Sequence, residues 1–287
     1  QGMGERQEVA MRINSARRDL SSISPDPAVR IIASAILRQR ERDCFSQTVA
    51  HEFIVIRSIH PELKSMPVEV IADGRLPAVS PGLSSYSETF FPMAPWVRKS
   101  HGKILLSPPR CLPGDICSWS CYQRRRLRIV ARHEFAHLAT HRIWGAQRNV
   151  PTWIEEGYAE LVAADDGRER EARRSVALSG ALLSLQDMHA INTSPSGEYY
   201  DLFYLAFLLL SQRYGRRAVR NFIYFLKNSA TWTNAFYRAF HVSLETFHES
   251  LVEYLDRIRL EPLEQFIPTP AISGLKFPGG LRKRRAT

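Results

Sequence analysis

Two histidines and a glutamate in the stretch ARHEFAHLA have the types and spacing that bind and use a metal ion. His133 and His137 are four residues apart, and the apolar residues around them recur at three- and four-residue intervals, which predicts a helix. Residues four apart lie on one helix face, about 6 Å apart along the axis, so both imidazoles can bind one ion. Glu134 is rotated by about 100° from His133, so its carboxylate can reach a water on that ion without being a ligand. These residues predict a zinc centre that activates water.

A catalytic zinc ion takes three protein ligands and one water, so a third ligand must come from elsewhere in the chain. His141 is one further turn along the same helix, about 12 Å from His133 on the axis, and one ion does not comfortably span that distance. We therefore expect His141 to be a polar helix residue.

The segment PTWIEEGYAELVAAD predicts a second helix that begins near Thr152. Thr152 followed three residues later by Glu155 has the form of a capping box, in which Glu155 folds back to the backbone amide of the N-cap residue. This assignment leaves Glu156, which follows His137 after 18 intervening residues, free for another role. Glu160 is one turn further on the same face, and two interpretations stay open: it accepts a hydrogen bond from a ligand imidazole, or it faces solvent.

A second copy of the tripeptide, His51-Glu52-Phe53, lacks these features. Its flanks alternate with period two, with Phe53 and Val55 on one face, which predicts a β-strand. Val55 also stands where the second imidazole of the motif would be. We therefore predict no metal chemistry at this copy.

The remaining pattern predicts an α+β order, with a mixed β region, a long helical region and a cleft between them. Residues 5–48 predict two helices, the second of which begins after Asp26-Pro27. Strand-like pieces follow in EFIVIRS, PVEVIAD and GKILLS, and the period is then helical from about residue 120 to about residue 262. The predicted organisation is an N-terminal helical segment (1–48), a main domain (49–262, with a β-rich part 49–119 and a helical part 120–262) and a basic tail (263–287) that we expect to be disordered.

The composition is that of a globular protein with a strongly basic balance: 44% of the 287 residues are hydrophobic, and the formal net charge is +10. Such a charge can indicate nucleic acid or an anionic membrane as a partner. Here 33 of the 39 basic residues are arginine and they are scattered, with dense runs only at Arg124–Arg126 and Arg282–Arg285, which argues against a nucleic-acid partner. The longest apolar run, Leu202–Leu210, is far shorter than the roughly 20 residues that span a bilayer, so we expect a buried helix and no membrane span.

Four cysteines leave the redox state open. Cys44 stands alone, whereas Cys111, Cys117 and Cys121 cluster at spacings unlike those of a zinc knuckle. A disulfide within the cluster, if the protein is exported, and plain buried thiols are the two alternatives.

The combination of HEFAH, 18 residues and EEGYA resembles the gluzincin zinc metallopeptidases, which include thermolysin-like enzymes and the M1-type aminopeptidases. WIEEGYAE is similar to their Trp-x-x-Glu-Gly-x-Ala segment, and the best match, over residues 100–255, is the smaller peptidase MA-like group. The resemblance implies one zinc ion per chain on His133, His137 and Glu156, with Glu134 as general base and proton shuttle. It also implies a two-lobed, thermolysin-like α+β fold in which a strand such as GKILLS forms an edge for an extended peptide.

Similar enzymes carry a tyrosine on a later helix that donates a hydrogen bond to the oxyanion. The segment GEYYDLFYLAFLLLSQRYG resembles that helix, and aligning its terminal Tyr214-Gly215 implies Tyr200 as the donor. Tyr199 stays an alternative, as does a purely structural role for Tyr200, whereas the spacing of Tyr204 favours the core. No Gly-x-Met-Glu-Asn segment precedes the active-site helix, so aminopeptidase specificity is not implied.

The sequence thus predicts a zinc-dependent peptidase, of endopeptidase type, with a peptide or protein substrate. Two alternatives stay open: a nucleic-acid-associated protease resembling the SprT-like group, and a non-catalytic basic protein that binds nucleic acid. The resemblance favours a periplasmic or secreted location, whereas a native start at Met3 favours the cytoplasm.

Overall fold

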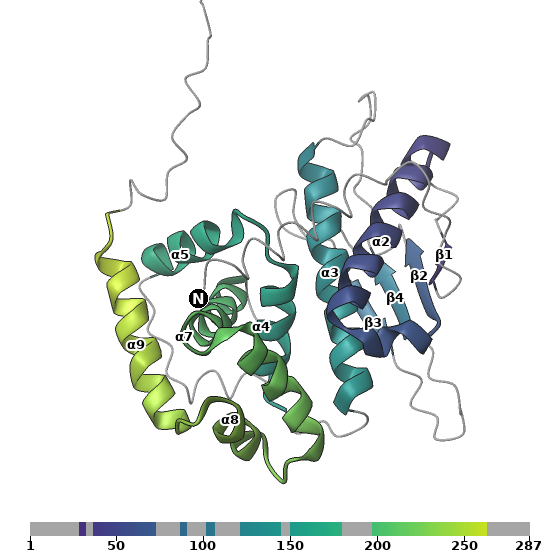
Figure 1. Ribbon diagram of the computed structural model, residues 1–287. Coiled ribbons are helices and arrows are strands. Elements are labelled where there is room, and N and C mark those ends of the chain that lie inside the picture. The colour runs from purple at the N-terminus through teal and green to yellow at the C-terminus, as the bar shows by residue number, and fades with distance from the viewer. Residues whose placement is uncertain are drawn as a thin grey trace, which may run out of the picture.

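The computed structural model of this chain describes residues 29–32, 37–72, 87–90, 102–106, 121–144, 150–179 and 197–262, and these residues are mostly helical (Figure 1). Their strands form one small sheet. In chain order the elements are β1 (Val29–Ile32), α2 (Gln39–Ile59), the 3-10 helix η1 (Pro61–Ser65), β2 (Val68–Ala72), β3 (Ser87–Phe90), β4 (Gly102–Leu106), α3 (Cys121–Trp144), α4 (Thr152–Ala163), α5 (Arg168–Ser179), α7 (Gly197–Asn228), α8 (Trp232–Phe240) and α9 (Leu244–Leu260).

The sheet has the order β1-β2-β4-β3, in which β1 and β4 each pair with β2 in parallel and β3 pairs with β4 antiparallel. Val68 and Val70 of β2, and Ile104 and Leu106 of β4, are buried because alternate side chains of a strand point to one face. The strands predicted in PVEVIAD and GKILLS are thus confirmed. The expectation that GKILLS forms a sheet edge is wrong, since β3 covers that side of β4, and the sequence SETF of β3 has only a weak strand pattern.

Helix α2 packs against α3 and β1, and it replaces the strand predicted at residues 52–58. Phe45, Val49, Phe53 and Ile56 are fully buried at three- and four-residue spacing. The alternation around Phe53 was therefore a local coincidence within a helix of 21 residues. This helix also runs across the predicted boundary between residues 48 and 49.

The helix predicted from residue 28 onward is wrong at its start. Residues 29–32 form β1, whose sequence VRII is rich in β-branched residues and pairs with β2, and the helix begins only at Gln39. Strand formation depends on such pairing with a distant segment, which a single stretch of sequence does not reveal.

Helix α3 lies between α2 with the sheet on one side and the helices that follow it on the other (Figure 1). It contributes side chains to two hydrophobic clusters. Leu127, Ala131 and Phe135 pack with α2 and the sheet, whereas Ile143 and Trp144 pack with the helices that follow α3. The helical period predicted from about residue 120 to about residue 262 is confirmed wherever that range is described. A mostly helical chain with a small sheet is compatible with the α+β class that we expected.

Helix α7 contains the apolar run Leu202–Leu210, which is buried as predicted except for the half-buried Leu208. The helix bends at Gly215, whose φ of 83° and ψ of 155° are not helical and suit a residue without a Cβ atom. In the described part of the chain, no helix has both the length and the apolar character needed to cross a membrane.

Several predictions fall outside the described residues. These include the first N-terminal helix, the Asp26-Pro27 helix start, Cys111, Cys117 and the tail 263–287. Cys121 begins α3, but its side chain is likewise outside what is described. Cys44 is a free thiol and is half-buried.

The carboxylate of Glu52 ties α2 to α3. It is fully buried and accepts hydrogen bonds from Arg128 Nε, at 2.8 Å, and from Arg132 Nε. Burial alone would raise the pKa of Glu52, but a hydrogen bond with His51 and the two guanidinium groups outweigh burial and lower the pKa to about 2. The first His-Glu-Phe tripeptide therefore has a structural role, because its glutamate neutralises arginines of α3.

We predict that Glu52→Gln lowers the free energy of unfolding by about 3 kcal/mol at pH 7, because both arginines lose their buried counter-charge. The folded pKa lies below the unfolded value of 4.5, so this stabilisation is present above pH 4.5 and declines as the pH falls toward 2. Urea denaturation at pH 7 and pH 3 should show a smaller difference between variant and wild type at pH 3. Glu249→Gln, at an exposed position of α9, is the matched control, and an equal difference at both pH values would contradict the prediction.

Candidate metal centre

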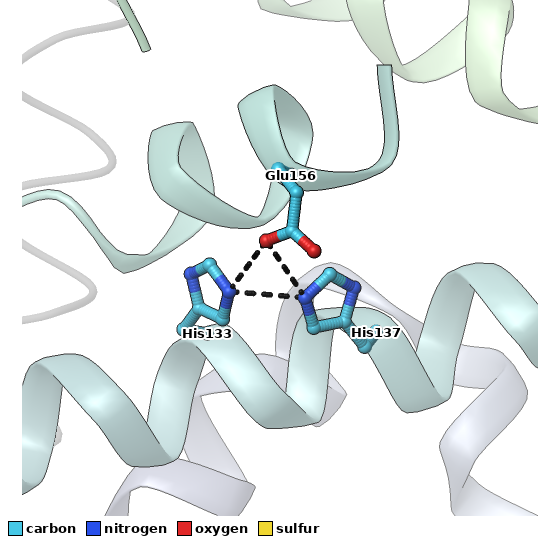
Figure 2. A group of neighbouring side chains, drawn as sticks. All are labelled: His133, His137 and Glu156. Carbon is cyan, nitrogen blue, oxygen red and sulfur yellow. Dashed lines mark hydrogen bonds and ion pairs between the residues drawn. The ribbon is translucent and has the colours of Figure 1, made fainter. Parts of the chain in front are cut away.

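His133 and His137 of α3 and Glu156 of α4 point toward one another (Figure 2). The two Nε2 atoms are 3.0 Å apart, and Glu156 Oε2 is 3.1 Å from His133 Nε2 and 3.4 Å from His137 Nε2. Ligand atoms 2.0–2.1 Å from a tetrahedral zinc ion would be about 3.3 Å from one another. The three atoms thus have the spacing of a metal ligand set, and this is the one such group found among the described residues.

Helix α4 presents Glu156 to α3 because its opposite face is buried against α7. Trp153 packs on Phe207, with ring centres 5.8 Å apart. Gly157 lies so close to α7 that a Cβ atom there would be 2.5 Å from Phe207 Cδ2 and 2.8 Å from the backbone oxygen of Phe203. The missing side chain at Gly157 lets the two helices approach, and this close packing sets the position of Glu156.

Glu160 contacts the first of the two candidate ligand histidines. Its Oε1 atom is 3.1 Å from His133 Nδ1, so Glu160 contacts this imidazole and does not simply face solvent. In neutral His133 the proton then lies on Nδ1, which leaves the lone pair of Nε2 directed toward Glu156 and His137. The geometry therefore prepares Nε2 to bind a cation.

Arg168 of α5 connects this arrangement to α7. Its Nε and Nη2 atoms are 2.8 and 2.7 Å from Glu160 Oε2, and Nη1 donates to Asp201, the neighbour of Tyr200. The guanidinium carbon also lies 4.9 Å from the centre of the Tyr204 ring, which is buried as predicted. Sequence reasoning missed Arg168 and Asp201, because one arginine among 33 carries no signal and its partners are on other helices.

Glu155 does not form the predicted capping box. The N-cap residue of α4 is Pro151, which has no backbone N–H to donate. Thr152 is already the first helical residue, so Glu155 also comes one position too late for a capping box. Glu155 Oε1 instead lies 2.5 Å from His141 Nε2 and 3.7 Å from His137 Nδ1. His141 therefore contacts a neighbour of the centre and is not one of its ligands, as expected.

Tyr200 lies beside His133, whereas the partly buried Tyr199 packs against the hydrophobic core. The ring centres of Tyr200 and His133 are 6.2 Å apart, and those of Tyr199 and Phe203 are 6.3 Å apart. Burial raises the pKa of Tyr200, and three nearby carboxylates raise it further, so its hydroxyl stays protonated at neutral pH. Glu134, which lies between the ligands on α3, is only 6% exposed.

The charges around the imidazoles favour a cation. Burial alone would lower the pKa of His133, but Glu156 and Glu160 outweigh burial and raise it well above its ordinary value. Burial would likewise raise the pKa of Glu156, yet His137 and His133 lower it. A divalent cation bound by these atoms would supply the positive charge without two protonated imidazoles 3.0 Å apart. The donor set of two imidazoles and one carboxylate suits zinc.

A comparison with known protein families gives no match for this sequence, and a comparison with curated proteins also gives none.

We predict that the chain binds one zinc ion and that His137→Ala loses it, because two of three ligands do not retain a catalytic zinc ion against a chelator. Elemental analysis after dialysis against a weak chelator measures the stoichiometry. His141→Ala removes an imidazole from the next turn of the same helix and should keep one zinc ion per chain. Equal zinc content in the two variants would contradict the ligand assignment.

Proposed function

We propose that this chain is a zinc-dependent peptidase of the gluzincin type, which hydrolyses internal peptide bonds of a peptide or protein substrate. The observation that carries the proposal is the approach of His133, His137 and Glu156 within 4.8 Å, with Glu134 on the same helix as the two histidines. A merely structural zinc site is usually closed by four protein ligands. Three protein ligands beside an acidic residue suit a site that keeps one position open for water.

Zinc, when bound, supplies a Lewis acid that lowers the pKa of water toward 7 and polarises a substrate carbonyl. The carboxylate of Glu134 accepts the proton of the attacking water and later gives it to the leaving amine. Its burial favours this exchange, because a carboxylate shielded from solvent passes the proton to the substrate without losing it to bulk water.

Tyr200 is the proposed donor to the oxyanion that develops on the substrate carbonyl. Its ring lies beside His133, and its raised pKa keeps the proton on the hydroxyl at neutral pH. The chain from Glu160 through Arg168 to Asp201 supports this role, because it connects the residue that orients His133 with the neighbour of Tyr200. In this proposal the network of Glu160, Arg168 and Asp201 would hold the candidate ligand His133 and the candidate donor Tyr200 in place together.

The sheet and the helices after α3 are proposed to correspond to the two lobes of a gluzincin. Among the described strands β1 and β3 are the two edges of the sheet, and β3 contacts α3, the helix that carries His133 and His137. An extended substrate would therefore add to the sheet beside β3.

We predict that Glu134→Gln keeps one zinc ion per chain but lowers peptide hydrolysis by about 10²- to 10⁴-fold, because the amide accepts no proton. Cleavage of a mixed peptide library, followed by mass spectrometry, measures the rate and the positions of the cuts. Wild-type and variant chains purified in parallel exclude a contaminating protease. Full activity of Glu134→Gln with unchanged zinc content would end the proposal.

Tyr200→Phe should lower kcat by about 10²- to 10³-fold with little change in KM, because the lost hydrogen bond forms mainly in the transition state. Tyr199→Phe is the matched control, since the neighbouring ring packs on Phe203 and should keep near-wild-type kcat. Steady-state kinetics on a peptide identified from the library measures both constants. Equal rates in the two variants would remove Tyr200 from the mechanism.

A further inference from the structure

Residues of α5, α7 and α9 line an open cavity of about 430 Å³ at which none of the residues of the candidate metal centre lies. Leu209, Tyr254 and Ile258 line it with buried side chains, and three arginines also line it: Arg173 and the exposed Arg213 and Arg257. A cavity of this size is in the range of small-molecule sites. Its mixture of apolar side chains and three arginines is suited to an anionic ligand.

The arginines leave the cavity with an excess of positive charge. Arg173 is held by Glu261, which also lines the cavity, and by Glu169 at 3.3 Å. Arg213 and Arg257 have no carboxylate partner at ion-pair distance among the described residues, and Arg257 Nε donates only to a backbone oxygen of its own helix, at 3.4 Å. Two of the three guanidinium charges are therefore not balanced within this part of the structure.

The hydroxyl of Tyr254 gives a second indication of a ligand. Tyr254 lines the cavity and is 8% exposed, and its buried hydroxyl has no hydrogen-bond partner among the described residues. Burial raises the pKa of Tyr254, so the hydroxyl keeps its proton and can donate. A buried donor without a partner is unfavourable in a folded protein, and a bound acceptor would remove this penalty.

We infer that the cavity between α5, α7 and α9 binds a phosphate monoester, with Arg213, Arg257 and the Tyr254 hydroxyl as donors to its oxygens. A phosphate monoester carries about two negative charges at neutral pH, which matches the two unbalanced guanidinium groups, whereas a carboxylate carries one. Guanidinium groups also donate two hydrogen bonds at once to phosphate oxygens. The volume beyond the phosphate leaves room for a small organic group over Leu209 and Ile258. This inference does not depend on peptide hydrolysis.

Isothermal titration of the full chain with glycerol 3-phosphate, at constant ionic strength, tests the site. We expect saturable binding of one molecule per chain, and about tenfold weaker binding in Arg213→Gln and in Tyr254→Phe. Arg217→Gln is the matched control, because Arg217 is an exposed arginine of the same helix that does not line the cavity and the charge change is identical. Arg213 is itself exposed, so this variant keeps the test valid if Tyr254→Phe does not fold.

A second titration, with vesicles that contain phosphatidic acid, distinguishes the source of the phosphate. Binding of glycerol 3-phosphate alone indicates a soluble ligand, whereas vesicle binding that Arg213→Gln weakens and Arg217→Gln does not indicates a lipid headgroup. Both results support the cavity as the site. Absence of binding to either probe, or equal weakening in Arg213→Gln and Arg217→Gln, would overturn the inference.

Discussion

The contact between α3 and α4 is the constraint on which the candidate centre depends, because it brings ring nitrogens from one helix to a carboxylate from another. The ring nitrogens and the carboxylate oxygen can bind one ion only if the two helices are positioned relative to each other to a fraction of an ångström. Gly157 gives α4 its close approach to α7, and the neighbouring Glu156 is thereby directed toward α3. The position of Glu156 in the candidate centre therefore depends on apolar packing between α4 and α7, on the face of α4 that is directed away from α3.

Carboxylates on both sides of α3 balance its basic residues. Glu52 of α2 accepts hydrogen bonds from Arg128 and Arg132 on one side of α3, and Glu160 of α4 contacts His133 on the other side. The two glutamates have similar chemistry but different consequences. Glu52 is surrounded by permanent cations and stays ionised, whereas the imidazoles near Glu160 and Glu156 are neutral ligands when they bind a metal ion. The two His-Glu-Phe copies thus differ in their surroundings more than in their own residues.

The sequence was most informative where a role depends on spacing along one helix. The positions of His133 and His137 were anticipated from helical geometry, and that of Glu156 from the resemblance of the 18-residue interval to the gluzincin pattern. The three side chains lie together in Figure 2. The errors arose where contacts with distant segments determine the secondary structure. VRII is a strand because it pairs with β2. The alternating residues after Glu52 belong to the long helix α2 and not to a strand. The links through Arg168 and Asp201 join separate helices, so no local pattern encodes them.

The place of α3 in two hydrophobic clusters has a further consequence for the way the chain melts. Each cluster contains side chains from a different part of α3. If either cluster unfolded, α3 would lose apolar contacts, and the other cluster would be destabilised because α3 also belongs to it. We therefore expect the two clusters to unfold together in one cooperative transition, and an ion bound by both α3 and α4 would make that transition more cooperative. Thermal resistance should then rise with free metal concentration by mass action, so heat tolerance and occupancy are two measures of one equilibrium.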